Sequence, residues 1–154
     1  MRLSKTAYYG DFFIYAGIVL GLAIYVWLQG QWSARLQWLG EFVLGMGAWT
    51  LLEYALHRWV LHRVPIIAPM HDAHHRAPRA LLGTPTPVTL AMIWILFFLP
   101  TWWYGSFNAA SGLTAGVMVG YMWYGILHHI AHHGRPVLLA TWASGHVRRH
   151  LRHH

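Results

Sequence analysis

The chain has 154 residues, of which 56% are hydrophobic and only 10% are charged, whereas about 25% of the residues in a soluble domain are charged. This composition, with its ten tryptophans and eight tyrosines, is typical of a membrane protein with a single domain, residues 1–154. The lack of cysteine excludes disulfides, a thiolate nucleophile and a cysteine-held iron–sulfur cluster. The net charge of +7 does not indicate a nucleic-acid partner, because the basic residues flank apolar stretches.

Four apolar segments each approach the ~20 residues that a helix needs to cross the hydrocarbon core of a bilayer. The first follows a basic N-terminus but lacks a convincing small-residue cleavage site, so we interpret it as a retained span rather than a signal peptide. The third contains Pro100, which predicts a kink or an early end. Because backbone groups in lipid must satisfy one another, we expect four transmembrane helices over roughly 12–29, 36–57, 88–105 and 109–130.

The basic residues predict how these spans are oriented. Ten of the eleven lie in the termini or between the second and third spans, and only Arg35 lies on the opposite side. The positive-inside rule therefore places both termini and the middle loop in the cytoplasm. Short outer connections predict two antiparallel helical hairpins. The expected fold class is all-α and integral to the membrane, with four transmembrane helices in two hairpins and a cytosolic histidine-rich helical cap from 57–82 and 128–154.

All thirteen histidines fall on the cytoplasmic side or at its membrane boundary. Spacings of three and four residues place side chains on one helix face, as for His71, His74 and His75. His57 and His62 are five residues apart, about 140° around an ideal α-helix, so they share a face only if the helix distorts or they serve different metals. Imidazole binds iron, zinc, copper and nickel, and this many converging histidines suit two ions.

Carboxylates are too few for a carboxylate-bridged di-metal site, so we expect mostly or wholly histidine ligands. Glu53 precedes His57 by one helical turn and could orient a ligand imidazole, or it could snorkel or pair with Arg58. Asp72 could act similarly or simply pair with Arg76. The whole set of acidic residues is Asp11, Glu41, Glu53 and Asp72.

The histidine spacings resemble the signature of the fatty acid hydroxylase superfamily, which includes sterol desaturases and carotenoid hydroxylases. That signature runs HX4H, HX2HH, HX3H and HX2HH, and the chain carries HRWVLH, HDAHH, HHIAHH and HLRHH in this order within residues 53–154. Each motif alone is weak, but the ordered set is highly specific. The metal ligands that the resemblance implies are His57, His62, His71, His74, His75, His128, His132, His150, His153 and His154.

The resemblance further implies a non-haem di-metal oxygenase with two irons, for which zinc can substitute in purified protein. The di-metal centre would oxidise a C–H bond of a membrane lipid with O2 and two external electrons. Hydroxylation is favoured over desaturation, and a fatty-acyl lipid over a sterol or a carotenoid. Outside the core pattern, His133 and His146 are expected to support the ligands, as are Glu53 and Asp72, while His129 is left without a role.

A ferredoxin or a cytochrome b5-like protein is the expected electron donor, because the sequence shows no cysteine cluster, nucleotide fingerprint or haem-carrier domain. The short chain without such a fused domain favours a bacterial enzyme of the inner membrane. Members of the superfamily usually continue past the last motif, whereas this sequence stops at His154. The chain is therefore either a fragment or one for which such a tail is dispensable.

Three other classes of protein stay open. A metal-handling or transport protein would place polar ligands near mid-membrane, where the third and fourth spans offer almost none. A di-haem cytochrome would carry paired histidines within its spans. A superfamily member with a merely structural metal site would bind metal without forming a product.

Overall fold

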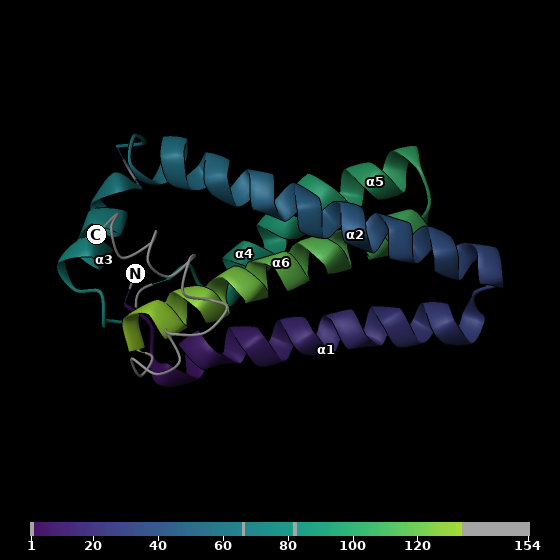
Figure 1. Cartoon of the computed structure of the whole chain (residues 1–154), viewed down its shortest axis with the longest axis horizontal. Coiled ribbons are helices and arrows are strands. Elements are labelled where there is room, and N and C mark those ends of the chain that lie inside the picture. Colours follow the sequence, from purple (N-terminus) through teal and green to yellow (C-terminus); the bar gives the residue numbers. More distant parts are fainter. Residues whose placement is uncertain (1, 66, 82, 134–154) are drawn as a thin grey trace.

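The computed structural model describes residues 2–65, 67–81 and 83–133, and within these ranges the chain is helical and contains no β-strand (Figure 1). The predicted all-α class is therefore confirmed for the described residues. In chain order the elements are α1 (Lys5–Gln29), α2 (Trp32–Ala55), the π-helical segment η1 (Leu56–Leu61), α3 (Ala68–Arg76), α4 (Thr86–Ile93), the π-helical segment η2 (Trp94–Phe98), α5 (Leu99–Tyr104) and α6 (Phe107–His133).

Local signals in the sequence set where the long helices begin and end. The Ser4 hydroxyl accepts a hydrogen bond from the Ala7 amide at 3.1 Å, which caps the start of α1. At the other end, only Gly30 and Gln31 separate α1 from α2. Ser106 caps α6 in the same way as Ser4 caps α1, because its hydroxyl accepts from the Ala109 amide at 3.1 Å. The two short connections join the helices into two hairpins, as predicted.

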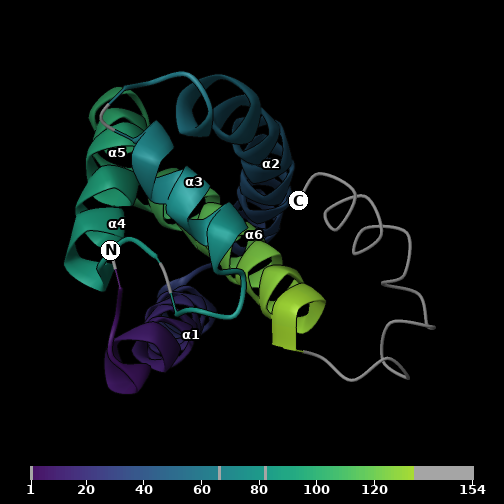
Figure 2. The same ribbon diagram turned by 90° about the vertical axis from the view of Figure 1, so that its left-hand side faces the viewer.

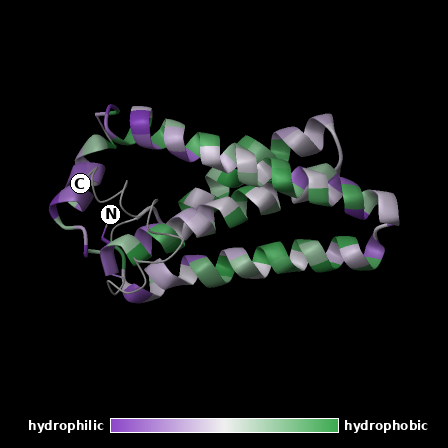
Figure 3. Ribbon diagram, viewed as in Figure 1, coloured by the Kyte–Doolittle hydropathy of each residue, from purple (hydrophilic) through white to green (hydrophobic). Residues whose placement is uncertain are grey.

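Two helical segments are long and apolar enough to cross a membrane, Lys5–Gln29 and Thr86–Tyr104. They correspond to the first and third expected spans. Their apolar side chains are largely exposed, as for Phe13 at 78%, which suits a lipid environment. Figure 3 shows that hydrophilic residues gather around α3. The second and fourth spans and the cytosolic position of the cap stay predictions.

Pro100 does not end the third span. Helix α4 widens into η2 directly before the proline and then continues as α5 to Tyr104. A proline ring clashes with the carbonyl four residues before it in a regular α-helix. A π-helical turn accommodates an irregular stretch of this kind, so the helix passes the proline.

Among the helices that the structure describes, α2 and α6 pack most closely. A Cβ atom at Gly116 of α6 would overlap the carbonyl oxygen of Phe42, and one at Gly45 of α2 would overlap the carbonyl oxygen of Leu113. The backbones therefore touch, as small residues allow in membrane helix pairs. Nearby, the indole N–H of Trp38 donates to the Ser111 hydroxyl at 3.2 Å, and this buried hydrogen bond adds a polar tie between the same two helices.

We expect Gly116→Ala to lower the free energy of unfolding by about 1–3 kcal/mol, because the added methyl group must push α2 away. Gly17→Ala is the matched control, since nothing lies within 4 Å of a Cβ at that position in α1. The control should leave stability unchanged or raise it slightly, because alanine favours a helix over glycine. Thermal unfolding in detergent micelles, followed by circular dichroism, measures both, and equal stability of the two variants would contradict the close contact.

Candidate metal centre

Three segments that are far apart in the sequence bring their histidines to one end of the bundle. η1 prolongs α2 at this end, α3 follows it, and the C-terminal end of α6 lies beside them (Figure 1). Figure 2 views the molecule from this end and shows α3 in front of the helical bundle. The described residues thus assemble the predicted histidine-rich end, although its last segment, 134–154, lies outside the described residues.

The helix distorts where His57 and His62 require it. η1 is a π-helical segment, in which the repeating hydrogen bond joins residues five apart rather than four. Residues at i and i+5 therefore come onto one side of the helix, and the rings of His57 and His62 lie 5.3 Å apart between centroids. Of the two explanations open from the sequence, a distorted helix is the one that the structure supports.

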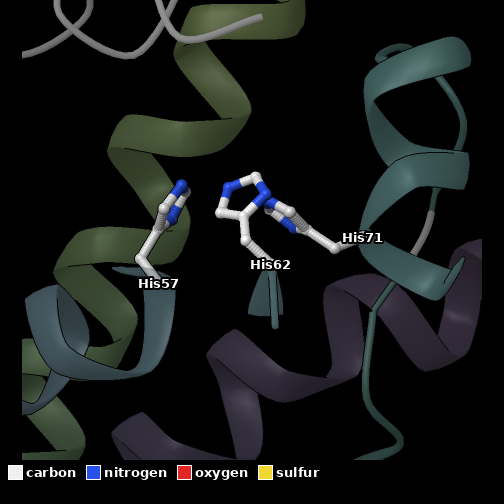
Figure 4. Close-up of side chains that lie close together, drawn as sticks. All are labelled: His57, His62 and His71. Carbon is white, nitrogen blue, oxygen red and sulfur yellow. The ribbon is translucent and has the colours of Figure 1, made fainter. Parts of the chain in front are cut away.

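The first group of ligands consists of His57, His62 and His71, and we call it triad 1. One nitrogen from each imidazole lies within 4.8 Å of the others. Figure 4 shows the three rings turned toward one another, from η1, from the turn after it and from α3. His75 adjoins this group, because its Nε2 lies 2.9 Å from the Nε2 of His71.

The second group of ligands, triad 2, consists of His74, His128 and His132. Its nitrogens also lie within 4.8 Å of one another. The His74 ring lies 4.6 Å from that of His128 and 4.8 Å from that of His132, between centroids. α3 supplies one histidine to each triad, and the centroids of His71 and His74 are 6.2 Å apart. The two triads are therefore neighbours.

The donor set fits a transition metal. A metal bonded to three imidazole nitrogens at about 2.1 Å holds most pairs of those nitrogens roughly 3–3.6 Å apart, so each triad would close by roughly 1–2 Å around an ion. Burial, followed by the neighbouring imidazoles of His57 and His75, lowers the pKa of His71 to about 3. His71 is therefore neutral at physiological pH, as a metal ligand must be.

The other predicted site residues lie around the triads in different ways. Asp72 is exposed, whereas its neighbour His71 is buried. Glu53 lies in α2, one turn before η1. His129 and His133 are on a different side of α6: their rings stack at 4.6 Å, and the Tyr8 hydroxyl lies 3.2 Å from His129 Nδ1. His146, His150, His153 and His154 lie outside the described residues.

A pocket of about 270 Å³ opens beside the triads. His71, His74 and His128 line part of it, and Asp11 and Tyr121 line another part. The sequence pattern assigns no role to Asp11, which is one of the four acidic residues of the chain. The sequence nevertheless contains an indication of a role for Asp11, because placing a carboxylate at the start of an apolar span costs free energy and such residues tend to be functional.

Residues 42–154, more than half of the chain, match the profile of the fatty acid hydroxylase family. The chain belongs to this family. The ordered histidine pattern read from the sequence thus identified the family, and the structure shows how two of its groups of histidines come together.

Several curated members of the fatty acid hydroxylase family are similar to this chain. The fatty acid 2-hydroxylase of Rattus norvegicus is 32% identical over 73% of the chain and 34% of its own length. The human (Homo sapiens) fatty acid 2-hydroxylase is 28% identical over 98% of the chain and 48% of its own length. A dihydroceramide fatty acyl 2-hydroxylase of Arabidopsis thaliana is 31% identical over 71% of the chain and 49% of its own length.

The chain thus spans between about a third and about half of the length of these relatives. No solved structure matches it.

Removing one ligand from a single triad should remove one metal ion. We expect iron-replete, tag-free protein to carry about two metal ions per chain, and His57→Ala or His74→Ala to carry about one, because each change leaves the other triad intact. His129→Ala is the matched control, since it removes an imidazole from α6 outside both triads. Elemental mass spectrometry on the purified chain gives the counts, and equal metal content in all the variants would contradict the two-triad site.

Proposed function

We propose that this chain is a membrane lipid hydroxylase that holds two irons and consumes O2 and two external electrons. The observation that carries the proposal is the pair of adjacent all-histidine triads beside a pocket in a member of the fatty acid hydroxylase family. A single structural ion would need only one such group. Two groups that share α3 favour a di-metal centre with a catalytic role.

The protein's contribution is the position and the protonation state of the ligands. Triad 1 and triad 2 would each hold one iron, with His75 beside triad 1 as a further ligand and His150, His153 and His154 completing the set. Bound iron would supply the O2 chemistry, in which one oxygen atom enters a C–H bond and the other leaves as water with two electrons and two protons. Glu53, Asp72 and His146 are proposed to support the ligands, and His133, which stacks on His129 on another side of α6, would do so only indirectly.

The pocket limits which part of a lipid reaches the triads. Pockets that enclose a whole drug-sized ligand are about 300–1,000 Å³, so about 270 Å³ suits the polar end of an acyl lipid and its first few carbons. This size suits one end of an acyl lipid, and we propose that the acyl end enters and is hydroxylated near its carbonyl. The names of the relatives point the same way, since they specify 2-hydroxylation of fatty acids and of the acyl chain of dihydroceramide.

The lipid and the electron donor would approach from different sides. We propose four spans with both termini and the histidine-rich end in the cytoplasm, which for a chain of this kind is the inner face of a bacterial inner membrane. The apolar, exposed surfaces of α1 and of the Thr86–Tyr104 segment would face lipid. Arg58, Arg63, Arg76 and Arg79 lie near the triads in sequence and would attract an acidic donor such as a ferredoxin or a cytochrome b5-like protein.

Purified protein with iron, a reducing ferredoxin system and 18O2 should convert an acyl lipid into a product that carries one 18O atom, detected by mass spectrometry. His132→Ala should lower the rate by at least about a hundredfold, because triad 2 loses a ligand. His129→Ala, which lies outside both triads, is the control and should stay within about threefold of wild type. Two bound metals with no oxidised product from any acyl lipid would identify a structural metal site and refute the hydroxylase.

A further inference from the structure

Asp11 joins three elements next to the triads. Its carboxylate accepts a hydrogen bond from the Thr86 hydroxyl at the start of α4, and its Oδ2 accepts another from the Tyr121 hydroxyl of α6 at 3.0 Å. Both donors are neutral hydroxyls, and within the described residues no lysine or arginine donates to this carboxylate. The two contacts fix the carboxylate at the wall of the pocket that His71 and His74 also line.

The two hydrogen bonds use only part of the capacity of the Asp11 carboxylate to accept hydrogen bonds. A carboxylate offers about four acceptor positions and no donor. Asp11 is only half-buried, and it is among the residues that line the pocket. A further donor entering the pocket can therefore hydrogen-bond to Asp11, whereas an anion meets a like charge in surroundings that screen it poorly.

We propose that Asp11 is a specificity-determining residue that accepts a hydrogen bond from the polar end of the lipid and disfavours a free carboxylate there. The substrates that meet this requirement are acyl lipids whose carbonyl bears a donor, such as the N–H of an amide. The inference rests on the proposed function, because the acyl end must enter this pocket for Asp11 to contact it. Asp11 and the histidines line the same pocket, so both would face the end of a lipid that enters it.

A structural role for Asp11 makes a different prediction. If the carboxylate only tied α1 to α4 and α6, its loss would weaken the binding of every acyl ligand to the same extent. A contact with the polar end instead changes the ratio between ligands of equal chain length. The test therefore compares three probes: palmitate, which is anionic and has no donor; methyl palmitate, which is neutral and has no donor; and palmitoylethanolamide, which is neutral and carries two donors at its polar end, an amide N–H and a hydroxyl.

Binding is measured on the zinc-loaded full chain in phosphatidylcholine nanodiscs, by native mass spectrometry with pairs of probes in competition. Wild type should prefer palmitoylethanolamide to either of the other probes by about tenfold or more, since a hydrogen bond to a charged group is at stake. Asp11→Asn should reduce the preference over palmitate to about twofold, because the negative charge is gone. The comparison between variants cancels the partitioning of each probe into the lipid.

Glu41→Gln is the matched control, because it also neutralises an acidic residue of a helix but lies outside the pocket lining. It should leave all three ratios at the wild-type values. Asp11→Ser is a second variant that also lacks the charge and keeps a hydroxyl toward Thr86, and it replaces Asp11→Asn if that variant does not fold. Melting temperature and zinc content show which variants are folded.

Two results would overturn the proposal. One is a wild-type protein that binds palmitate or methyl palmitate as tightly as palmitoylethanolamide. The other is an unchanged preference over palmitate in the folded Asp11 variants. Failure of the hydroxylase proposal looks different, because iron-loaded wild type would then bind palmitoylethanolamide selectively and yield no oxidised product. The binding ratios and the product assay therefore separate the two hypotheses.

Discussion

The backbone contact between α2 and α6 determines where the candidate site forms. At Gly45 and Gly116 there is no room for a Cβ atom, so the two backbones touch at these positions, and a side chain there would force the helices apart. α2 leads into η1 with His57, and α6 ends with His128 and His132. Because this contact fixes how the two helices lie against each other, the histidines at their ends lie at the same end of the bundle and at a similar level along its axis.

The π-helical turn then adjusts the direction of individual side chains. In a regular α-helix, His57 and His62 would point about 140° apart, and only one of them could face a given ion. The wider turn of η1 brings both toward His71. π-helical turns are rare and often occur at functional sites, because they cost backbone hydrogen-bond geometry that something else must stabilise. A bound metal would provide that stabilisation.

The chemistry of the candidate site follows from the shortage of carboxylates. Burial and the neighbouring imidazoles lower the pKa of His71, so this imidazole is neutral at physiological pH. A neutral nitrogen ligand set would leave the full positive charge of bound metal ions to act on a ligand that binds beside them. Asp11 lines the pocket, and its carboxylate is held by two hydroxyl groups rather than by a metal-binding histidine. It is therefore available to accept a hydrogen bond from the polar end of a ligand.

Local sequence patterns determined the helical class, the two hairpins, the histidine motifs and the family, because apolar periodicity, capping residues and spacing are encoded within short stretches of chain. The division of the histidines was decided only by the tertiary structure. His71 and His74 lie in one motif and on one helix, yet they join different triads, because η1 and the turn after it bring His57 and His62 to His71, whereas the end of α6 brings His128 and His132 to His74. The position of Asp11 likewise became clear only from the tertiary structure, in which its carboxylate accepts a hydrogen bond from Tyr121, 110 residues away. Contacts between distant segments depend on how whole helices pack, and the spacing of residues within a short stretch of sequence does not predict this packing.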